Sequence, residues 1–472
     1  MSGIGNLIWI VYLVNFAIIV TIVCFQKDNP ATSMAWIMCL VAFPVVGGLL
    51  FLIFGVGVRT LTEKKYKEKL EMNEQYILEQ QKEYAEKHAD IARSSIINYF
   101  LNCDSVYTEN NEVEIFTDGK DKYMRLFQDI ENAKESVELL YFIFNDDVTG
   151  NKLMDLLVKK SNEGVKIRLL YDGGGTMMTP KKFFKKLNNS KNGQAAEFFS
   201  VRLSSLYKVN HRNHRKIVII DGTIAYLGGM NIGDEYANIS KKKHPPFRDT
   251  HIRIYGEAAE YAARCFAMDW EFSTGERILV RNLSGRFNMD GKLPMQIVAS
   301  GPDSREEEIK CGMIKMINSA KRYVYIQTPY FVPDQAFLTA LQMSKKSGVD
   351  VRVMIPGIPD KKYVYHTTMS YIGELLESGI EVYLYPAFIH AKTVTADDKI
   401  LTIGSANTDI RSFKLLFEIN AFMYDEKTAK HSRQIFEKDM SVCRALTAEE
   451  YKKRGIIKVV QEGFFRLFSP IM

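Results

Sequence analysis

The sequence predicts an α/β protein in which two similar units follow an N-terminal pair of apolar helices. Three observations support this prediction. The chain begins with long stretches that carry no charge, it then alternates apolar strands with amphipathic helices, and its second half repeats the pattern of its first. A chain of 472 residues has room for more than one domain of about 150 residues.

The composition excludes several classes of protein. A hydrophobic content of 46%, with 30 Gly and 13 Pro, excludes a disordered or collagen-like chain. The six Cys residues show no CxxC or zinc-finger spacing, which argues against a disulfide scaffold or a structural zinc site. The formal net charge of +6 is too small to indicate nucleic-acid binding, and it is compatible with an anionic membrane surface.

The N-terminal region contains two uncharged apolar segments, residues 2–26 and 30–58. Each exceeds the ~20 apolar residues that a membrane-spanning helix needs. We therefore predict two transmembrane helices within residues 1–58, joined by the short turn at residues 27–29. A cleaved signal peptide fits less well, because no basic segment precedes the first run and a second run follows at once.

The charges around these segments predict their orientation. The connecting turn carries one basic residue, Lys27, whereas Arg59, Lys64, Lys65 and Lys67 follow the second segment closely. Positively charged residues favour the cytoplasmic side, so we expect both termini and the large remainder of the chain in the cytoplasm.

Residues 59–103 are predicted to form a charged helical linker, because Lys and Glu recur there at helical spacing. An α/β pattern follows. The apolar run at residues 137–144 reads as a buried strand, residues 152–161 as a helix, and residues 165–171 as another buried strand. Such continuously apolar strands indicate a sheet that is covered on both faces.

The second half of the chain repeats this arrangement. Ala133-Lys134 precedes the first strand as Ala320-Lys321 precedes the run at residues 323–327, and Gly164 before the next strand matches Gly348. The repeat predicts two pseudo-symmetric domains, over residues 104–292 and 293–472.

One pattern of polar residues occurs once in each domain. Lys, Asp and Asn follow a histidine at offsets of +2, +7 and +17, with two small residues at +14 and +15. The first set is His214, Lys216, Asp221 and Asn231, and the second is His390, Lys392, Asp397 and Asn407.

This doubled pattern suits the chemistry of a phosphodiester. A His and a Lys two residues apart on a strand point to the same face, so the two sets would gather two imidazoles, two ammonium groups and two amides around one pocket. The cations and amides would hold a phosphate and its charged transition state. The imidazoles would supply a nucleophile and a general acid. No metal ion and no cofactor are expected, because the lysines neutralise the charge.

With these residues the sequence resembles the phospholipase D superfamily, and within it the bacterial cardiolipin synthases. The resemblance runs nearly from end to end. Its further motifs are Gly228-Gly229-Met230-Asn231, Arg248-Asp249-Thr250-His251, Ser300-Gly301-Pro302-Asp303, Thr328-Pro329-Tyr330-Phe331 and Asn407-Thr408-Asp409-Ile410-Arg411. It implies two phospholipase D-like domains, each a mixed sheet flanked by helices, behind a membrane hairpin in the bacterial plasma membrane.

The resemblance also implies a reaction. His214 would attack the phosphorus of one phosphatidylglycerol and expel glycerol, leaving a phosphatidyl-histidine. His390 would protonate the glycerol and then activate the hydroxyl of a second phosphatidylglycerol, giving cardiolipin. Lys216, Lys392, Asn231 and Asn407 would bind the phosphate oxygens.

In relatives a carboxylate downstream of each histidine fixes its tautomer. By that comparison Asp249 would support His214 and Glu418 would support His390. Asp221 and Asp397 complete the two catalytic motifs, and we interpret them as structural residues that hold the turn after each strand.

Alternative functions share the same pocket. The protein could be a phospholipase D-type hydrolase or a membrane-tethered nuclease, and a third reading is a lipid-binding protein without activity. The apolar hairpin favours a lipid substrate over nucleic acid. The sequence does not decide between transfer and hydrolysis, which depends on water exclusion. It also leaves open the range of acceptors and a possible homo-oligomer.

The C-terminal segment, residues 452–468, mixes basic and apolar residues at helical spacing. Two interpretations stay open for it, docking to a membrane surface and packing on its own domain.

Overall fold

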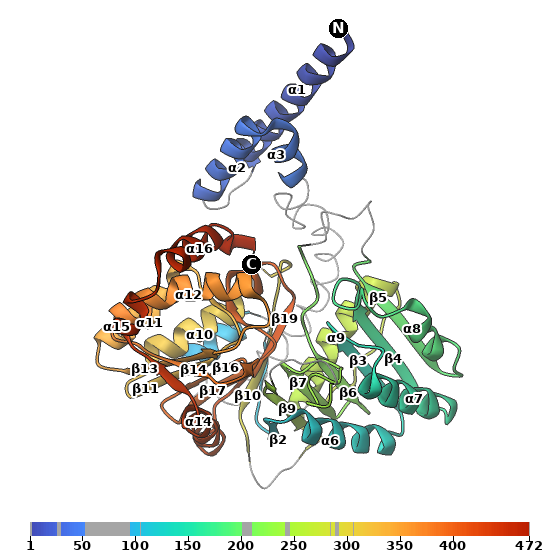
Figure 1. Ribbon diagram of the computed structural model, residues 1–472. Helices are drawn as coiled ribbons and strands as arrows, with labels where there is room; N and C mark the ends of the chain where they lie inside the picture. Colours follow the sequence, from blue (N-terminus) through green and yellow to red (C-terminus); the bar gives the residue numbers. More distant parts are fainter. Residues whose placement is uncertain are drawn as a thin grey trace. The chain divides into compact units, whose positions relative to one another are not determined.

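The computed structural model describes residues 2–25, 30–51, 95–103, 105–200, 210–240, 246–283, 285–287, 292–304 and 306–471 (Figure 1). The chain forms two compact units. One comprises residues 1–64 with 201–211, and the other comprises residues 65–200 with 212–472. Most of the predicted charged linker lies outside the described residues.

The described part of the N-terminal unit forms the helices α1 (Ser2–Phe25), α2 (Pro30–Ala42) and α3 (Pro44–Leu50). Helix α1 covers the first apolar segment. The second segment is broken at Phe43, because Pro44 cannot continue the hydrogen-bond ladder of α2. Among the described residues no helix meets the combined requirement of length and apolarity for a membrane crossing, so the predicted transmembrane hairpin stays a prediction.

A buried asparagine joins the helices of this unit. Because Pro44 lacks an N–H, it cannot donate to the carbonyl of Leu40 one turn earlier. Asn15 of α1 donates its Nδ2–H to that Leu40 oxygen at 3.3 Å and to the Pro44 oxygen at 2.9 Å. The side chain thus satisfies a carbonyl that the break in the helix leaves without its usual donor.

The larger unit contains two mixed sheets. The seven-stranded sheet has the order β2-β9-β7-β6-β3-β4-β5, in which β3, β4 and β5 are parallel and the other neighbours are antiparallel. Its strands are β2 (Asn111–Phe116), β3 (Ser136–Tyr141), β4 (Lys166–Asp172), β5 (Gly193–Phe198), β6 (Ile217–Ile220), β7 (Ile224–Gly228) and β9 (His251–Gly256). The helices of this half are α6 (Gly119–Asn132), α7 (Val148–Asn162), α8 (Lys181–Asn188) and α9 (Ala258–Thr274).

The nine-stranded sheet has the order β1-β10-β19-β17-β16-β11-β13-β14-β20. Its strands are β1 (Tyr107–Thr108), β10 (Met295–Ser300), β11 (Tyr323–Gln327), β13 (Asp350–Pro356), β14 (Glu381–Tyr385), β16 (Thr393–Ala396), β17 (Ile400–Gly404), β19 (Glu418–Met423) and β20 (Arg444–Leu446). Its helices are α5 (Ser95–Leu101), α10 (Glu308–Ser319), α11 (Gln335–Lys346), α12 (Lys362–Glu377), α13 (Ile410–Lys414), α14 (Glu426–Met440), α15 (Ala448–Lys452) and α16 (Ile456–Arg466). Two short parallel pairs, β8 (Phe247–Arg248) with β15 (Phe388–Ile389) and β12 (Phe331–Val332) with β18 (Thr408–Asp409), complete the strands.

The α/β class and the repeated strand–helix–strand pattern are confirmed. The predicted strand pair at residues 137–144 and 165–171 corresponds to β3 and β4, and the repeat of this pair corresponds to β11 and β13. The side chains of these strands are mostly buried, as expected for a sheet covered on both faces.

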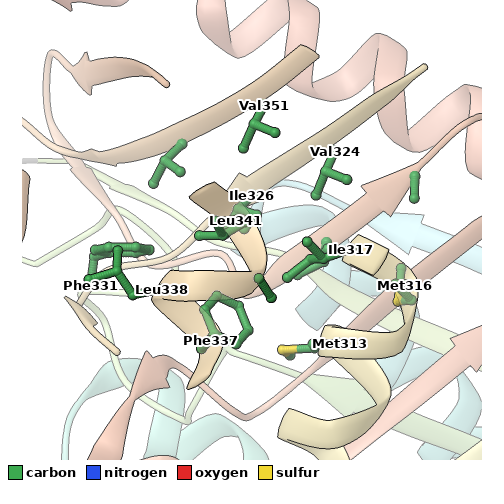
Figure 2. Close-up of a cluster of buried hydrophobic side chains, with 14 of the residues drawn as sticks. Met313, Met316, Ile317, Val324, Ile326, Phe331, Phe337, Leu338, Leu341 and Val351 are labelled. Atoms are coloured by element: carbon green, nitrogen blue, oxygen red, sulfur yellow. The ribbon is translucent and has the colours of Figure 1, made fainter. Parts of the chain in front are cut away.

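Apolar packing unites the two halves. One core cluster contains Ile252 and Trp270 from the first half together with Leu401 and Ile419 from the second. The core of the second half, drawn in Figure 2, is formed by Met313 and Ile317 of α10, Leu338 of α11 and the strands β11 and β13. Burial of this apolar surface fixes the positions from which the polar motifs project.

The start of the larger unit contributes to the second sheet. Helix α5 buries Ile97 and Phe100 in the core that α10 covers, and β1 pairs with β10. Residues that the sequence places in the linker and at the beginning of the first domain therefore complete the second half.

Candidate active site

Each HxK segment lies immediately before a buried strand. His214 and Lys216 precede β6, and His390 and Lys392 precede β16, so all four lie just outside the strands themselves. The four residues after each lysine form the predicted strand, which confirms that part of the sequence pattern.

The two HxK segments are bound by backbone of the opposite half. The N–H of His214 donates to the Phe417 carbonyl at 2.9 Å, and the N–H of Phe417 donates to the Arg212 carbonyl at 3.0 Å. In the second set, β15 pairs with β8 and the N–H of His390 donates to the Arg248 carbonyl at 2.7 Å. Each histidine is thus carried next to a carboxylate that belongs to the other half.

This exchange decides which carboxylate supports which histidine. The Nδ1 of His214 lies 2.9 Å and 3.1 Å from the two carboxylate oxygens of Glu418. The Nδ1 of His390 lies 2.6 Å from Oδ2 of Asp249. The pairing inferred from the order along the chain, Asp249 with His214 and Glu418 with His390, is wrong. Each carboxylate contacts the histidine of the opposite half, and the distance along the sequence does not reveal this arrangement.

These contacts leave the two Nε2 atoms available for chemistry. A carboxylate at Nδ1 stabilises the tautomer that carries its hydrogen there, which presents Nε2 as a lone pair. The same carboxylate stabilises an imidazolium that forms later. Both histidines are therefore arranged to act as a nucleophile or to transfer a proton at Nε2.

The two lysines are buried close to the histidines. The Nζ of Lys216 donates to the carbonyl of His214, and the Nζ of Lys392 donates to the carbonyl of His390, each at 2.5 Å. Burial lowers the pKa of Lys216 to about 7 and that of Lys392 to about 8. A bound anion would raise both pKa values again, so this pair of ammonium groups is suited to hold a phosphate.

The charges of the two sets act on each other. Burial, followed by the positive charges of Lys216, Lys392 and His390, lowers the pKa of His214 well below its ordinary value. Burial and Lys392 lower the pKa of His390, while Asp249 opposes that shift. Burial raises the pKa of Glu418 to about 7. The two HxK sets therefore form one electrostatic site, and a neutral His214 is favoured at neutral pH.

The two asparagines are both buried but have different partners. Asn231 accepts the N–H of Ile143 at 3.1 Å and donates to the hydroxyl of Tyr236 at 2.6 Å. The side chain of Asn407 interacts with the carboxylate of Asp409, and its Oδ1 is buried without a hydrogen-bond partner in the structure. A phosphate role for these amides stays a prediction.

Asp221 and Asp397 lie at the opposite end of the strands that follow the lysines. Asp221 accepts the backbone N–H groups of Lys134, Glu135 and Ser136. Asp397 accepts those of Lys321, Arg322 and Tyr323. Both have a positive φ, 50° and 57°, and so form the turn that ends each strand. These contacts fit the structural interpretation of both aspartates, and their inclusion in the catalytic motifs stays a prediction.

The structure adds residues that the sequence reasoning missed. Asp269 of α9 forms a buried ion pair with Arg215, with both carboxylate oxygens 2.8 Å from Nη1, and accepts from Asn213 at 2.8 Å. Ser405 donates to Oε2 of Glu418 at 2.5 Å. An Arg between a His and a Lys at the start of an apolar strand was the available signal, because a buried guanidinium requires a carboxylate partner.

Aromatic rings enclose the histidines. The ring of Phe142 lies 5.1 Å from that of His214, and the rings of Tyr236, Phe247 and Phe388 lie within about 6 Å of His390. Nearby, His251 is fully buried, in keeping with a core position. The low polarity around the imidazoles contributes to their lowered pKa values.

In the part of the chain that the structure describes, no three His, Cys, Asp or Glu side chains are grouped as metal ligands would be. The prediction that the reaction needs no metal depends on the lysines, which would neutralise the charge of the phosphate.

Comparisons with known proteins agree on one family. The family model described as "Cardiolipin synthase, PLD-like domain" matches residues 126–242 and 313–440, which include both HxK sets. A second model, "Phospholipase_D-nuclease N-terminal", matches residues 13–55.

Curated relatives cover the whole chain. The major cardiolipin synthase of Bacillus subtilis is 40% identical over 100% of both chains. A cardiolipin synthase of Oceanobacillus iheyensis is 39% identical over 99% of both chains.

A solved structure supports the fold. The crystal structure of a phosphatidylserine synthase from Haemophilus influenzae covers 76% of this chain and 95% of its own, with a TM-score of 0.60 and 15% sequence identity.

Proposed function

Because this chain belongs to the cardiolipin synthase family of the phospholipase D superfamily, we propose that it is a phosphatidyltransferase that makes cardiolipin and glycerol from two molecules of phosphatidylglycerol. The same family suggests that it works at the bacterial plasma membrane, with the larger unit on the cytoplasmic side. The observation that carries the proposal is the pair of histidines, each with a carboxylate at Nδ1 and a buried lysine beside it.

In the first half-reaction, Nε2 of His214 attacks the phosphorus of one phosphatidylglycerol. The bond from phosphorus to the glycerol oxygen breaks, and His390 gives its Nε2 proton to that oxygen. The products are free glycerol and a phosphatidyl group bonded to His214. The negative charge of the bound phosphate keeps Lys216 and Lys392 protonated and raises the pKa of His390, which favours the acid form that this step needs.

In the second half-reaction, His390 takes a proton from a primary hydroxyl of a second phosphatidylglycerol. The oxygen attacks phosphorus, the bond to His214 breaks, and cardiolipin leaves. One phosphodiester is exchanged for another, so the reaction needs no nucleotide. Glu418 stabilises the charge on His214 while its Nε2 is substituted, and Asp249 stabilises the imidazolium of His390.

The test is a reaction of the purified full-length protein with phosphatidylglycerol vesicles, without nucleotide and with EDTA. We expect equal amounts of cardiolipin and glycerol, and a loss of more than about 10³-fold in His214→Ala and His390→Ala. His431→Ala is the matched control, because His431 is exposed on α14. Phosphatidic acid without cardiolipin would instead identify a hydrolase, and loss of activity with EDTA would contradict the metal-free mechanism.

The covalent intermediate needs its own measurement. With His390→Ala and a phosphatidyl ester of p-nitrophenol, the leaving group departs without an acid, while the acceptor lacks a base. We expect one equivalent of nitrophenolate and a phosphatidyl adduct on His214 in peptides from protein that was quenched at alkaline pH. An adduct on any other residue, or a burst without an adduct, would contradict the assignment of His214 as nucleophile.

A further inference from the structure

Two charged side chains of helix α16, those of Glu462 and Arg466, contact the protein. Glu462 is buried and accepts from Nε of Arg454 at 2.8 Å. Arg466 donates to the carbonyl of Ser370 at 3.1 Å and pairs with Glu374, both on α12. The side of α16 that packs on the protein therefore makes ion pairs and hydrogen bonds, and the ring of Phe465 stacks on that of His366 of α12 at 5.7 Å.

The outward side of the same helix is apolar. Ile456, Ile457, Val460, Phe464 and Leu467 are 74%, 72%, 63%, 55% and 77% exposed. Their spacing places them on one arc of the helix. A helix on the surface of a water-soluble body has the reverse arrangement, so this arc, which we call the α16 face, indicates an apolar partner. Figure 1 shows α16 lying over α12 at the outside of the second half.

The charges near the α16 face indicate what the partner is. Lys452, Lys453 and Lys458 are exposed, and they are the exposed charged side chains of residues 452–471. The carboxylate of the helix itself, Glu462, is turned inward and neutralised by Arg454. An exposed apolar arc in a segment whose exposed charges are all basic matches the interface of a bilayer that contains anionic lipid, where the apolar side chains enter the acyl region and the long lysines reach the headgroups.

The chain that follows α16 leads toward the active site. The 3-10 turn at Ser469–Ile471 packs against α13, and α13 lies between Asn407 and Glu418 in the sequence. A bilayer in contact with the α16 face would therefore meet the protein near a turn that packs on the segment between Asn407 and Glu418.

We propose that the α16 face docks the larger unit on an anionic phospholipid bilayer. The proposal deepens the proposed function by naming the surface through which the larger unit meets its lipid. Its primary readout is physical contact and needs no turnover, so it fails or holds independently of the reaction.

The experiment uses the full-length protein in vesicles of 30% phosphatidylglycerol and 70% phosphatidylcholine, with benzoylphenylalanine in place of Phe464. A matched control carries the same group in place of Met343, an exposed apolar residue of α11. After irradiation, we expect lipid adducts at position 464 that exceed those at position 343 by at least about tenfold. We also expect the yield at 464 to fall several-fold in pure phosphatidylcholine or in high salt. Crosslinks to a second copy or to the N-terminal helices, or equal lipid yields at the two positions, would overturn the proposal.

A second pair of variants tests the consequence for activity. Val460→Glu places a charge on the α16 face, and Met343→Glu places one on the control surface. We expect Val460→Glu to raise the KM for phosphatidylglycerol in vesicles several-fold with little change in kcat, and Met343→Glu to change neither. Detergent-dispersed substrate should restore the KM of Val460→Glu, because docking is then not required. An unchanged KM in vesicles, or a KM that stays raised in detergent, would contradict the role of this surface.

Discussion

The two halves of the active site contain the same His and Lys, but they hold the carboxylate beside each histidine in different ways. Asp249 supports His390 directly at 2.6 Å and accepts its other contact from the N–H of Thr250 at 2.7 Å. Glu418 is one methylene longer, and Ser405 donates to it from the far side. In the first motif the position that corresponds to Ser405 is Gly229.

These differences belong together. A Cβ on Gly229 would lie 2.1 Å from Oδ1 of Asp249, so that position has no room for a side chain. At the equivalent place in the second motif, the hydroxyl of Ser405 donates to Oε2 of Glu418, while Oε1 makes the shorter contact with His214. Each half therefore uses a matched set, a short carboxylate with glycine or a long carboxylate with serine. The duplicated motifs are not interchangeable, which fits different roles for the two histidines.

The largest expected effect separates these roles through the carboxylates. Glu418→Gln and Asp249→Asn should each lower kcat with phosphatidylglycerol by about 10³–10⁴-fold, because the amide disfavours the useful tautomer and no longer stabilises an imidazolium. With the phosphatidyl ester of p-nitrophenol, the first half-reaction needs no acid. The nitrophenol burst should then recover in Asp249→Asn and stay slow in Glu418→Gln.

The reversed pattern of recovery would also have a clear meaning. Recovery in Glu418→Gln and not in Asp249→Asn would mean that His390 is the nucleophile. Recovery in neither variant would mean that the carboxylates act mainly by holding the fold of the site, which circular dichroism of both variants would check.

A smaller effect is expected from exchanging the small residues of the two motifs. Gly229→Ser should lower kcat by about 10²-fold, because the added side chain displaces Asp249 and with it His390. Ser405→Gly should cost only about tenfold, since Glu418 keeps its contact with His214 and loses one hydrogen bond. Steady-state kinetics on vesicles measures both. Equal losses in the two variants would remove the distinction drawn between the halves.

Much of this comparison could be predicted from the sequence. The offsets from each histidine identified the HxK sets, and the apolar runs located the strands that hold them, because local spacing and hydrophobic pattern determine both. The pairing of Glu418 with His214 could not be predicted in this way. It depends on short strand pairs between the halves and on the contacts of residues 212–214 with Phe417, which are distant in the sequence.

The same limit applies elsewhere in the chain. The two apolar segments were found from their lack of charge, whereas the contact of Asn15 with the Leu40 carbonyl depends on how α1 and α2 pack. The contribution of α5 to the second core was hidden by its continuity with a charged linker. Asp269 was missed because a single acid in an amphipathic helix carries no signal until its Arg215 partner is located.

The dependence of activity on pH should reflect the lysines. Burial lowers the pKa of Lys216 to about 7 and that of Lys392 to about 8, and only the protonated forms bind a phosphate electrostatically. We expect kcat/KM to fall by more than about tenfold as pH rises from 7 to 9, because kcat/KM follows the free enzyme, in which both lysines lose their protons over this range. The fall in kcat should begin at higher pH, since bound phosphate raises both pKa values. A flat kcat/KM across this range would contradict the lysine assignment, provided that circular dichroism shows the protein folded throughout.

The smallest effect concerns stability and again compares the two halves. A lysine whose pKa is lower in the folded protein than in the unfolded chain destabilises the fold below the unfolded pKa. The full loss of stability applies at pH values below the pKa of the lysine in the folded protein. It disappears as pH rises toward the pKa of the lysine in the unfolded chain. Lys216→Met should therefore stabilise the protein by about 1 kcal/mol at pH 6, after the loss of one hydrogen bond to the carbonyl of His214 is included.

Lys392→Met should stabilise less, because the pKa of Lys392 is lowered less. Both variants should be inactive, and both gains should shrink at pH 9. Thermal unfolding followed by circular dichroism at the two pH values measures these differences, with Lys399→Met on the partly exposed turn after β16 as the control. A lower melting temperature in Lys216→Met at pH 6 would show that the ammonium group supports the fold as well as the phosphate. Burial of the two lysines in the active site would then not lower the stability of the folded protein for the sake of function, as we infer here.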